Sequence, residues 1–115
     1  MGNASPVSVH ATDDYRLSDA LVRFQGGDQV PLSLFVAEYP RGDGPPLHIH
    51  PYAELFLVER GAVKFTAGDE ETEISAGNIV VVDAETKHRF EGASDELSRV
   101  VSVHPAAEVV QENLS

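Results

Sequence analysis

The sequence has no cysteine and few basic residues. Without cysteine there can be no disulfide, no thiolate metal ligand and no cysteine nucleophile. Only 8 Lys and Arg residues stand against 19 Asp and Glu residues, giving a formal net charge of −11. Such an acidic surface repels phosphate backbones and anionic lipids, so we expect neither a nucleic-acid partner nor a membrane partner.

Long apolar runs are also missing. No segment approaches the length of a membrane span, and residues 1–14 lack the basic start and apolar centre of a signal peptide. We therefore expect a cytoplasmic protein. A chain of 115 residues has room for one domain, which we place at residues 1–115. It is long enough to bury a hydrophobic core.

Short β-forming segments separated by turns fill most of the chain. They cover residues 31–39, 54–59, 62–67, 71–75, 79–82, 88–90 and 97–103. With a candidate short edge strand at Val7 to Val9 and the extended stretch at 48–50, this makes about eight or nine short strands with tight turns, which is typical of an antiparallel sandwich or barrel. Near the C-terminal end, Pro105 suits a first helical position, and the spacing of Val109, Val110 and Leu114 predicts a short helix over about 105–114.

The segment LHIHPYAE, residues 47–54, places His48 and His50 one residue apart. In an extended strand both imidazoles point to one face, roughly 6.6 Å apart along the chain, and can converge on one ion. Glu54 has the same parity, although Pro51 interrupts the strand between them. His88, at the start of a later strand, is the candidate that closes such a site. The alternative is structural, since a histidine in a strand is usually a satisfied core or surface residue.

Two longer patterns around these residues resemble the motifs of the cupin superfamily. The first motif, residues 42–61, reads Gly42, DGPPL, His-Ile-His, PYA, Glu54, LFLVER, Gly61, and every fixed position and spacer agrees. The second motif, residues 77–92, keeps the spacing and His88. It departs from the pattern at three positions, where Asp83, Glu85 and Gly92 stand in place of proline, glycine and asparagine. Glu85 is uncomfortable there if the backbone needs a positive φ.

The resemblance implies an all-β fold, a single-domain cupin jelly-roll barrel. It also implies one divalent metal ion bound by His48, His50, Glu54 and His88. Three imidazoles and one carboxylate suit Fe, Mn, Ni, Co or Zn. Four protein ligands on an octahedral ion leave about two positions open, enough for a bidentate substrate or for a substrate and O₂.

Residues beside the ligands are candidates for the pocket. Phe56 and Val58 share the parity of Glu54, and Phe90 shares that of His88, so we expect all three to line the interior. Tyr52 either donates a hydrogen bond to a metal-bound water or substrate, as a catalytic residue beside Glu54, or packs at the barrel mouth. Strand 31–39 offers two faces between which the sequence does not decide.

Other charged and histidine side chains have less specific positions. Arg89 has the opposite parity to His88 and is expected to face away, so the inferred pocket has no assured cation. His10 and His104 are expected to be surface or cap residues rather than ligands.

The complete ligand set favours an enzyme acting on a small oxygen-rich metabolite, such as a diketone, a keto or hydroxy acid, or a sugar derivative. Dioxygenase and isomerase or cyclase chemistry are both open. The alternative is a non-catalytic cupin module that binds a metal and a small ligand, and a third interpretation is a purely structural metal. Apolar residues on both faces of strand 54–59 predict a homodimer.

Overall fold

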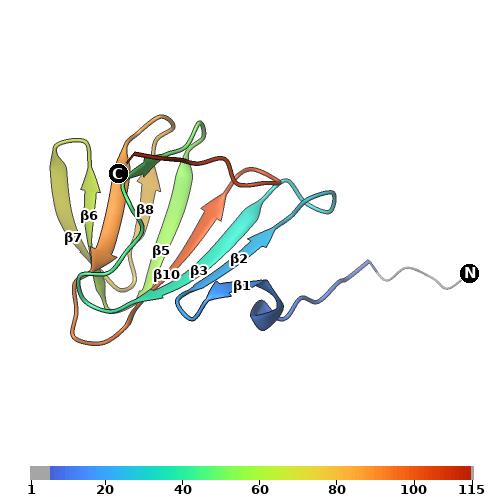
Figure 1. Ribbon diagram of the computed structural model, residues 1–115, viewed down its shortest axis with the longest axis horizontal. Coiled ribbons are helices and arrows are strands. Elements are labelled where there is room, and N and C mark those ends of the chain that lie inside the picture. Colours follow the sequence, from blue (N-terminus) through green and yellow to red (C-terminus); the bar gives the residue numbers. More distant parts are fainter. Residues whose placement is uncertain (1–5, 115) are drawn as a thin grey trace, which may run out of the picture.

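The computed structural model describes residues 6–114, which form two antiparallel sheets (Figure 1). After a short 3-10 helix, Thr12–Tyr15, the strands are β1 (Arg16–Ser18), β2 (Leu21–Gln25), β3 (Ser33–Tyr39), β4 (His48–Ile49), β5 (Glu54–Arg60), β6 (Ala62–Ala67), β7 (Glu70–Ser75), β8 (Ile79–Val82), β9 (His88–Gly92), β10 (Ser98–His104) and β11 (Glu112–Asn113). One sheet has the order β1-β2-β3-β10-β5-β8 and the other β11-β4-β9-β6-β7. The predicted all-β jelly roll is confirmed. No helix among the described residues is long and apolar enough to cross a membrane.

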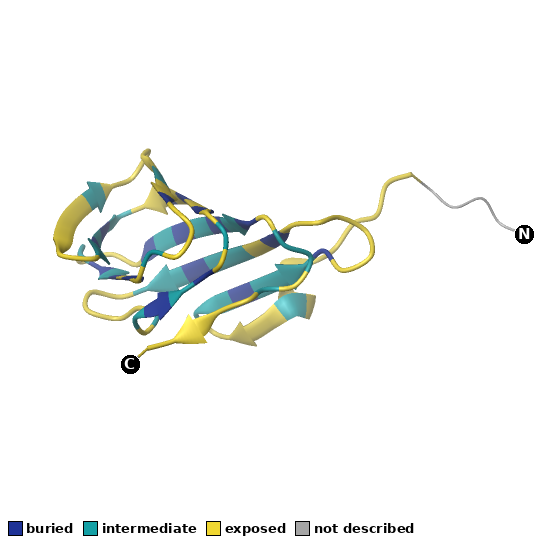
Figure 2. Ribbon diagram, turned by 90° about the horizontal axis from the view of Figure 1, so that it is seen from above, coloured by how far each residue is buried: buried dark blue, intermediate teal, exposed yellow. Residues whose placement is uncertain are grey.

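Alternating side chains build the core between the sheets. Along β5, Glu54, Phe56 and Val58 are buried, while Leu55 and Leu57 point outward. Buried and exposed residues alternate in this way because successive side chains of a strand point to opposite faces of the sheet. Figure 2 shows the alternation as dark bands between lighter ones along the central strands.

The main core cluster is aliphatic and aromatic. Its rings meet edge to face, with centroids 5.7 Å apart for Phe56 and Phe65 and 5.3 Å apart for Phe56 and Phe90. The cluster consists of Phe56, Val58, Val63, Phe65, Val82, Phe90 and Val100. Each fully buried side chain of this size contributes about 1.5–3 kcal/mol of transfer free energy. This core fixes β5, β9 and β10, the strands that carry the site.

Four residues in the two motifs have a positive φ, namely Gly42, Gly61, Gly77 and Glu85, and two of them bear on the packing of the fold. Gly61, between β5 and β6, has φ 74°, and a Cβ there would lie 2.7 Å from Ser98 Oγ. Glu85 has φ 63° and is the only non-glycine residue with positive φ among residues 6–114. Its N–H donates to the carbonyl of His50 at 2.9 Å. The positive φ of Glu85 therefore agrees with the expectation that a non-glycine residue is strained at this position.

The predicted C-terminal helix is wrong. Residues 105–114 run as bends followed by β11, which pairs with β4. The backbone groups that a helix would use internally are bonded to distant parts of the chain: Val109 N–H donates to Gln25 Oε1 at 2.8 Å, and Leu114 N–H donates to the carbonyl of Leu47 at 2.8 Å. An isolated helix of this length is only marginally stable. The hydrogen bonds to distant residues therefore determine the conformation of this segment.

Candidate metal centre

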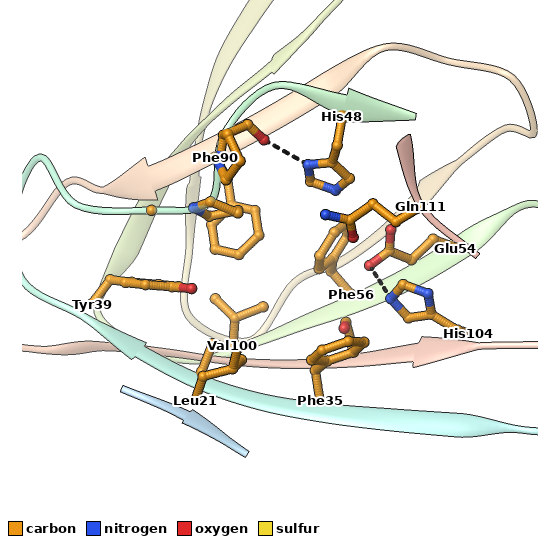
Figure 3. Close-up of a pocket in the computed structure, with 15 residues that line it drawn as sticks. Leu21, Phe35, Tyr39, His48, Glu54, Phe56, Phe90, Val100, His104 and Gln111 are labelled. Carbon is orange, nitrogen blue, oxygen red and sulfur yellow. Dashed lines mark hydrogen bonds and ion pairs between the residues drawn. The ribbon is translucent and has the colours of Figure 1, made fainter. Parts of the chain in front are cut away.

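Four residues from three segments converge between the sheets. β4 and β9 pair so that His48 lies opposite His88. His50 follows β4 in the turn, and Glu54 is the first residue of β5, on the other sheet. The carboxylate therefore reaches across from one sheet to histidines held by the other, and Figure 3 shows His48 and Glu54 directed into the same cavity.

The ligand atoms of these four residues are close enough to share one ion. One atom from each of His48, His50, Glu54 and His88 lies within 4.8 Å of the others, and all four residues are buried. Their exposed fractions are between 1% and 4%. Burying three imidazoles and a carboxylate together is costly unless their polar atoms have partners.

Each of the three imidazoles is oriented by a backbone carbonyl. The Nδ1 atoms of His48, His50 and His88 lie 2.7 Å from the carbonyl oxygens of Pro46, Val110 and Thr86, respectively. A carbonyl oxygen only accepts, so each Nδ1 carries the hydrogen, and in the neutral ring Nε2 presents a lone pair. Fixing a metal-binding histidine through its other nitrogen is the usual supporting contact in metal sites.

The Nε2 atom of His50 tests whether a metal fits. It lies 3.0 Å from Glu54 Oε1, yet it has no hydrogen-bond partner among the described residues. His88 Nε2 is 3.2 Å from the same oxygen. When these rings are neutral and carry their hydrogen on Nδ1, their Nε2 lone pairs face a carboxylate oxygen, an arrangement that a cation between them stabilises. The donor set and its orientation fit a divalent ion.

The local electrostatics favour the ligand-competent forms of His48 and Glu54. Burial lowers the pKa of His48 to about 4, which keeps that imidazole neutral at neutral pH. Burial opposes ionisation of Glu54, but its contacts with His104, His50 and His88 outweigh burial and hold its pKa well below the usual range. Burial also disfavours protonation of His50, but Glu54 and the Val110 carbonyl together raise its pKa. A metal ion would displace that proton, as metal binding to histidine does generally.

His104 is the site residue that the sequence did not reveal. It is the last residue of β10, is 2% exposed, and places Nε2 2.9 Å from Glu54 Oε2. The expectation of a surface or cap position for His104 was wrong. The inward alternation of Ser98, Val100 and Ser102 continues to His104, so extending the strand by one residue was the available signal.

Tyr52 lies behind His104 rather than at the cavity. Its hydroxyl is 2.7 Å from His104 Nδ1 and accepts the Val110 N–H at 3.2 Å. Its ring stacks on His50 with an interplanar angle of 11°. Burial raises the pKa of the Tyr52 hydroxyl, which therefore remains protonated and can donate.

A cavity of about 350 Å³ opens beside the cluster. Its lining comprises Leu21, Phe35, Ala37, Tyr39, Gly44, Pro45, Pro46, His48, Glu54, Phe56, Phe90, Val100, Ser102, His104 and Gln111 (Figure 3). Phe56 and Phe90 lie where the sequence placed them. Val58 faces inward but belongs to the core and does not line the cavity, because it lies further along β5, where core side chains fill the space. The face of β3 that lines the cavity carries Phe35, Ala37 and Tyr39.

Among residues 6–114, no lysine or arginine lines this cavity. Arg89 is paired with Glu91 on the surface, Arg41 with Asp95, and Arg99 with Glu38 and Glu59. The walls are mostly apolar and aromatic. Positive charge toward a ligand would therefore come from a bound metal.

One of the comparisons with known proteins identifies the family of this chain. A family model described as a cupin domain matches residues 35–104, more than half of the chain. The search of curated proteins finds no match.

Solved structures share the fold at low sequence identity. An oxalate oxidase in complex with the substrate analogue glycolate is 16% identical, with a TM-score of 0.73, over 83% of this chain and 54% of that one. A variant of oxalate decarboxylase from Bacillus subtilis is 16% identical, with a TM-score of 0.74, over 84% and 29%. An RmlC-like cupin family protein with a double-stranded β-helix fold from Methanocaldococcus jannaschii is 19% identical, with a TM-score of 0.67, over 90% and 95%. The chain thus spans about half the length of the oxalate oxidase.

Proposed function

The chain belongs to the cupin family, and from that premise we propose that it is a metal-dependent enzyme acting on a small oxygen-rich metabolite. The observation that carries the proposal is the orientation of the three imidazoles. Each gives Nδ1 to a backbone carbonyl, which leaves Nε2 for the position that Glu54 also faces.

The proposed metal ligands are His48, His50, Glu54 and His88. This donor set suits Fe, Mn, Ni, Co or Zn, and one structural neighbour, the oxalate decarboxylase of Bacillus subtilis, has Mn(II) centres. A divalent ion bound here would supply Lewis acidity and open positions for substrate oxygens or O₂. The site borders the cavity, which favours a reactive role over a closed structural one.

The lining of the cavity narrows the substrate class. Apolar and aromatic walls suit a metabolite with an apolar body, and His48 and Glu54, two of the proposed metal ligands, line the same cavity. A sugar needs many polar partners, and this lining offers few. A small dianion such as the oxalate of the neighbours has no apolar body for these walls. We therefore favour a β-diketone or an apolar keto or hydroxy acid.

The state of His104 bears on the reaction type. An isomerase needs a free acid or base beside the substrate, but both ring nitrogens of His104 are occupied, one by Tyr52 and the other by Glu54. The remaining walls of the cavity are mostly apolar and aromatic and supply few groups that could act as acid or base. Dioxygenase-type chemistry is therefore the favoured activity, with the chain's own residues binding and orienting the substrate.

Oxygen consumption tests this proposal. Protein loaded with Fe(II) is mixed with a panel of diketones and keto acids, and O₂ uptake is recorded beside binding of the same compounds by calorimetry. We expect uptake with at least one apolar chelating compound, and none in His88→Ala. Binding without uptake would instead indicate a non-catalytic binding module.

We also propose a homodimer. Leu55 and Leu57 on β5 stand opposite Val81 and Ile79 on β8, and all four side chains are exposed on the outer face of the sheet. Ile79 and Val81 are more than 60% exposed. A contiguous apolar patch of this kind on a soluble domain usually marks an interaction surface.

A further inference from the structure

A chain of hydrogen bonds runs from the backbone of the C-terminal segment to Glu54. Val110 N–H donates to the Tyr52 hydroxyl at 3.2 Å, which lies 2.7 Å from His104 Nδ1. His104 Nε2 then lies 2.9 Å from Glu54 Oε2, a contact drawn in Figure 3. His104 and Glu54 are both nearly inaccessible to solvent, so water does not compete for this contact.

The direction of each bond follows from the chemistry of the groups. A carboxylate that binds a metal carries no proton, so Oε2 of Glu54 in the proposed site only accepts, and His104 Nε2 must carry the hydrogen. With its hydrogen on Nε2, the neutral His104 ring has an acceptor at Nδ1, so the Tyr52 hydroxyl, which accepts from Val110 N–H, donates its own proton to Nδ1. The chain therefore selects the Nε2–H form of His104, whereas the three candidate ligands are held in the Nδ1–H form. His104 thus presents no lone pair to the metal position.

The two oxygens of Glu54 have different surroundings. Oε1 faces His50 Nε2 at 3.0 Å and His88 Nε2 at 3.2 Å. Oε2 faces His104 alone among these histidines, at 2.9 Å. One oxygen therefore belongs to the ligand cluster, while the other is turned to a hydrogen-bond donor.

We propose that His104 is a positioning residue that engages Oε2 of Glu54, so that Glu54 binds the metal through Oε1 alone. The proposal rests on the proposed metal site. A carboxylate that binds through one oxygen takes one coordination position rather than two, so the contact keeps a second position open for substrate. A chelating substrate, or a substrate together with O₂, needs both open coordination positions.

Water molecules on Mn(II) report this difference without any need for activity. Protein is loaded with Mn(II), and bound waters are counted from the broadening of the electron paramagnetic resonance signal in ¹⁷O-enriched water. We expect about two waters in the wild type and about one in His104→Phe, because Glu54 then binds through both oxygens. His104→Gln, whose amide can still donate to Oε2, is the matched control and keeps the wild-type count.

The outcomes separate this inference from the proposed function. If wild-type protein takes up no Mn(II), the metal site itself is wrong, and the inference falls with it. If wild-type protein binds Mn(II) and His104→Phe gives the same water count, His104 does not set how Glu54 binds, while the metal site stands.

A second measurement decides the matter if His104→Phe does not fold. In wild-type protein loaded with diamagnetic Zn(II), long-range ¹H–¹⁵N correlations identify the hydrogen-bearing nitrogen of His104. We expect the hydrogen on Nε2. A ring with hydrogen on Nδ1 alone would overturn the proposal, because Nε2 could not then donate to Glu54.

Discussion

At the scale of single residues, the backbone of the protein itself orients the imidazoles of the candidate metal centre. Every imidazole of the cluster has one nitrogen bonded to a carbonyl of a defined backbone segment. A ligand held in this way loses little conformational freedom when it binds, so the cost of ordering is met during folding. We therefore expect metal affinity to change by different amounts when a metal-binding histidine is substituted and when the backbone segment that orients it is altered.

Glu85 is a residue where local geometry and side chain conflict. Its φ of 63° lies in the left-handed region, which costs a non-glycine residue about 1 kcal/mol or more. We predict that Glu85→Gly raises the free energy of unfolding by about 0.5–1 kcal/mol, after allowing for the added freedom of glycine in the unfolded chain. Urea denaturation measures this change. Glu85→Ala keeps a Cβ at the same φ and should give no gain; an equal gain in both variants would refute the strain explanation.

The spacing of the motifs allowed the four clustered residues to be predicted, because three of them lie within one short segment and the fourth lies in a second motif. His104 could not be found in that way. It is 50 residues from Glu54 along the chain, and only the pairing of β10 with β5 brings the two strands together. Likewise, parity placed Val58 inside correctly but could not show where along β5 the cavity ends and the core begins.

At the scale of elements, the C-terminal segment is the part of the fold that sequence periodicity described wrongly. The spacing of its apolar residues is compatible with a helix, but its backbone is bonded to residues far away in the sequence. Val110 alone contributes its carbonyl to His50 at 2.7 Å and its N–H to Tyr52 at 3.2 Å. The strands were easier to predict because alternation is a local property. The path of this segment depends on long-range partners.

We predict that Val110→Pro weakens metal binding by about tenfold or more, because proline removes the N–H that supports Tyr52 and restrains the peptide that orients His50. Competition with a chromophoric chelator measures the affinity. Val110→Ala keeps both backbone groups, and the side chain of Val110 is 53% exposed, so this control should bind metal as the wild type does. Equal affinity in the two variants would show that the segment does not support the centre.

At the scale of the whole molecule, the two sheets of this small sandwich cover each other only on their inner faces. The faces turned inward form the core and the cavity, and the outer face of β5 and β8 remains apolar. The strong acidic charge keeps separate copies apart at long range. The proposed dimer would therefore depend on this patch rather than on opposite charges.

We predict that Leu57→Glu converts a dimer into a monomer, because it places a charge at the centre of the patch formed with Leu55, Ile79 and Val81. Light scattering coupled to size exclusion gives the molar mass. Leu17→Glu is the control, since Leu17 is also exposed but lies on β1, at the opposite edge of the same sheet. A monomeric wild type, or a Leu57→Glu variant that remains dimeric, would contradict the assigned interface.

The most direct test of the account is the metal content of the purified chain. Elemental analysis after loading and desalting should find about one divalent first-row ion per wild-type chain, and well under half of that in His88→Ala, which loses one of four ligands. His10→Ala removes an exposed histidine outside the cluster and should retain the full content. A His88→Ala variant that holds as much metal as the wild type would contradict the site.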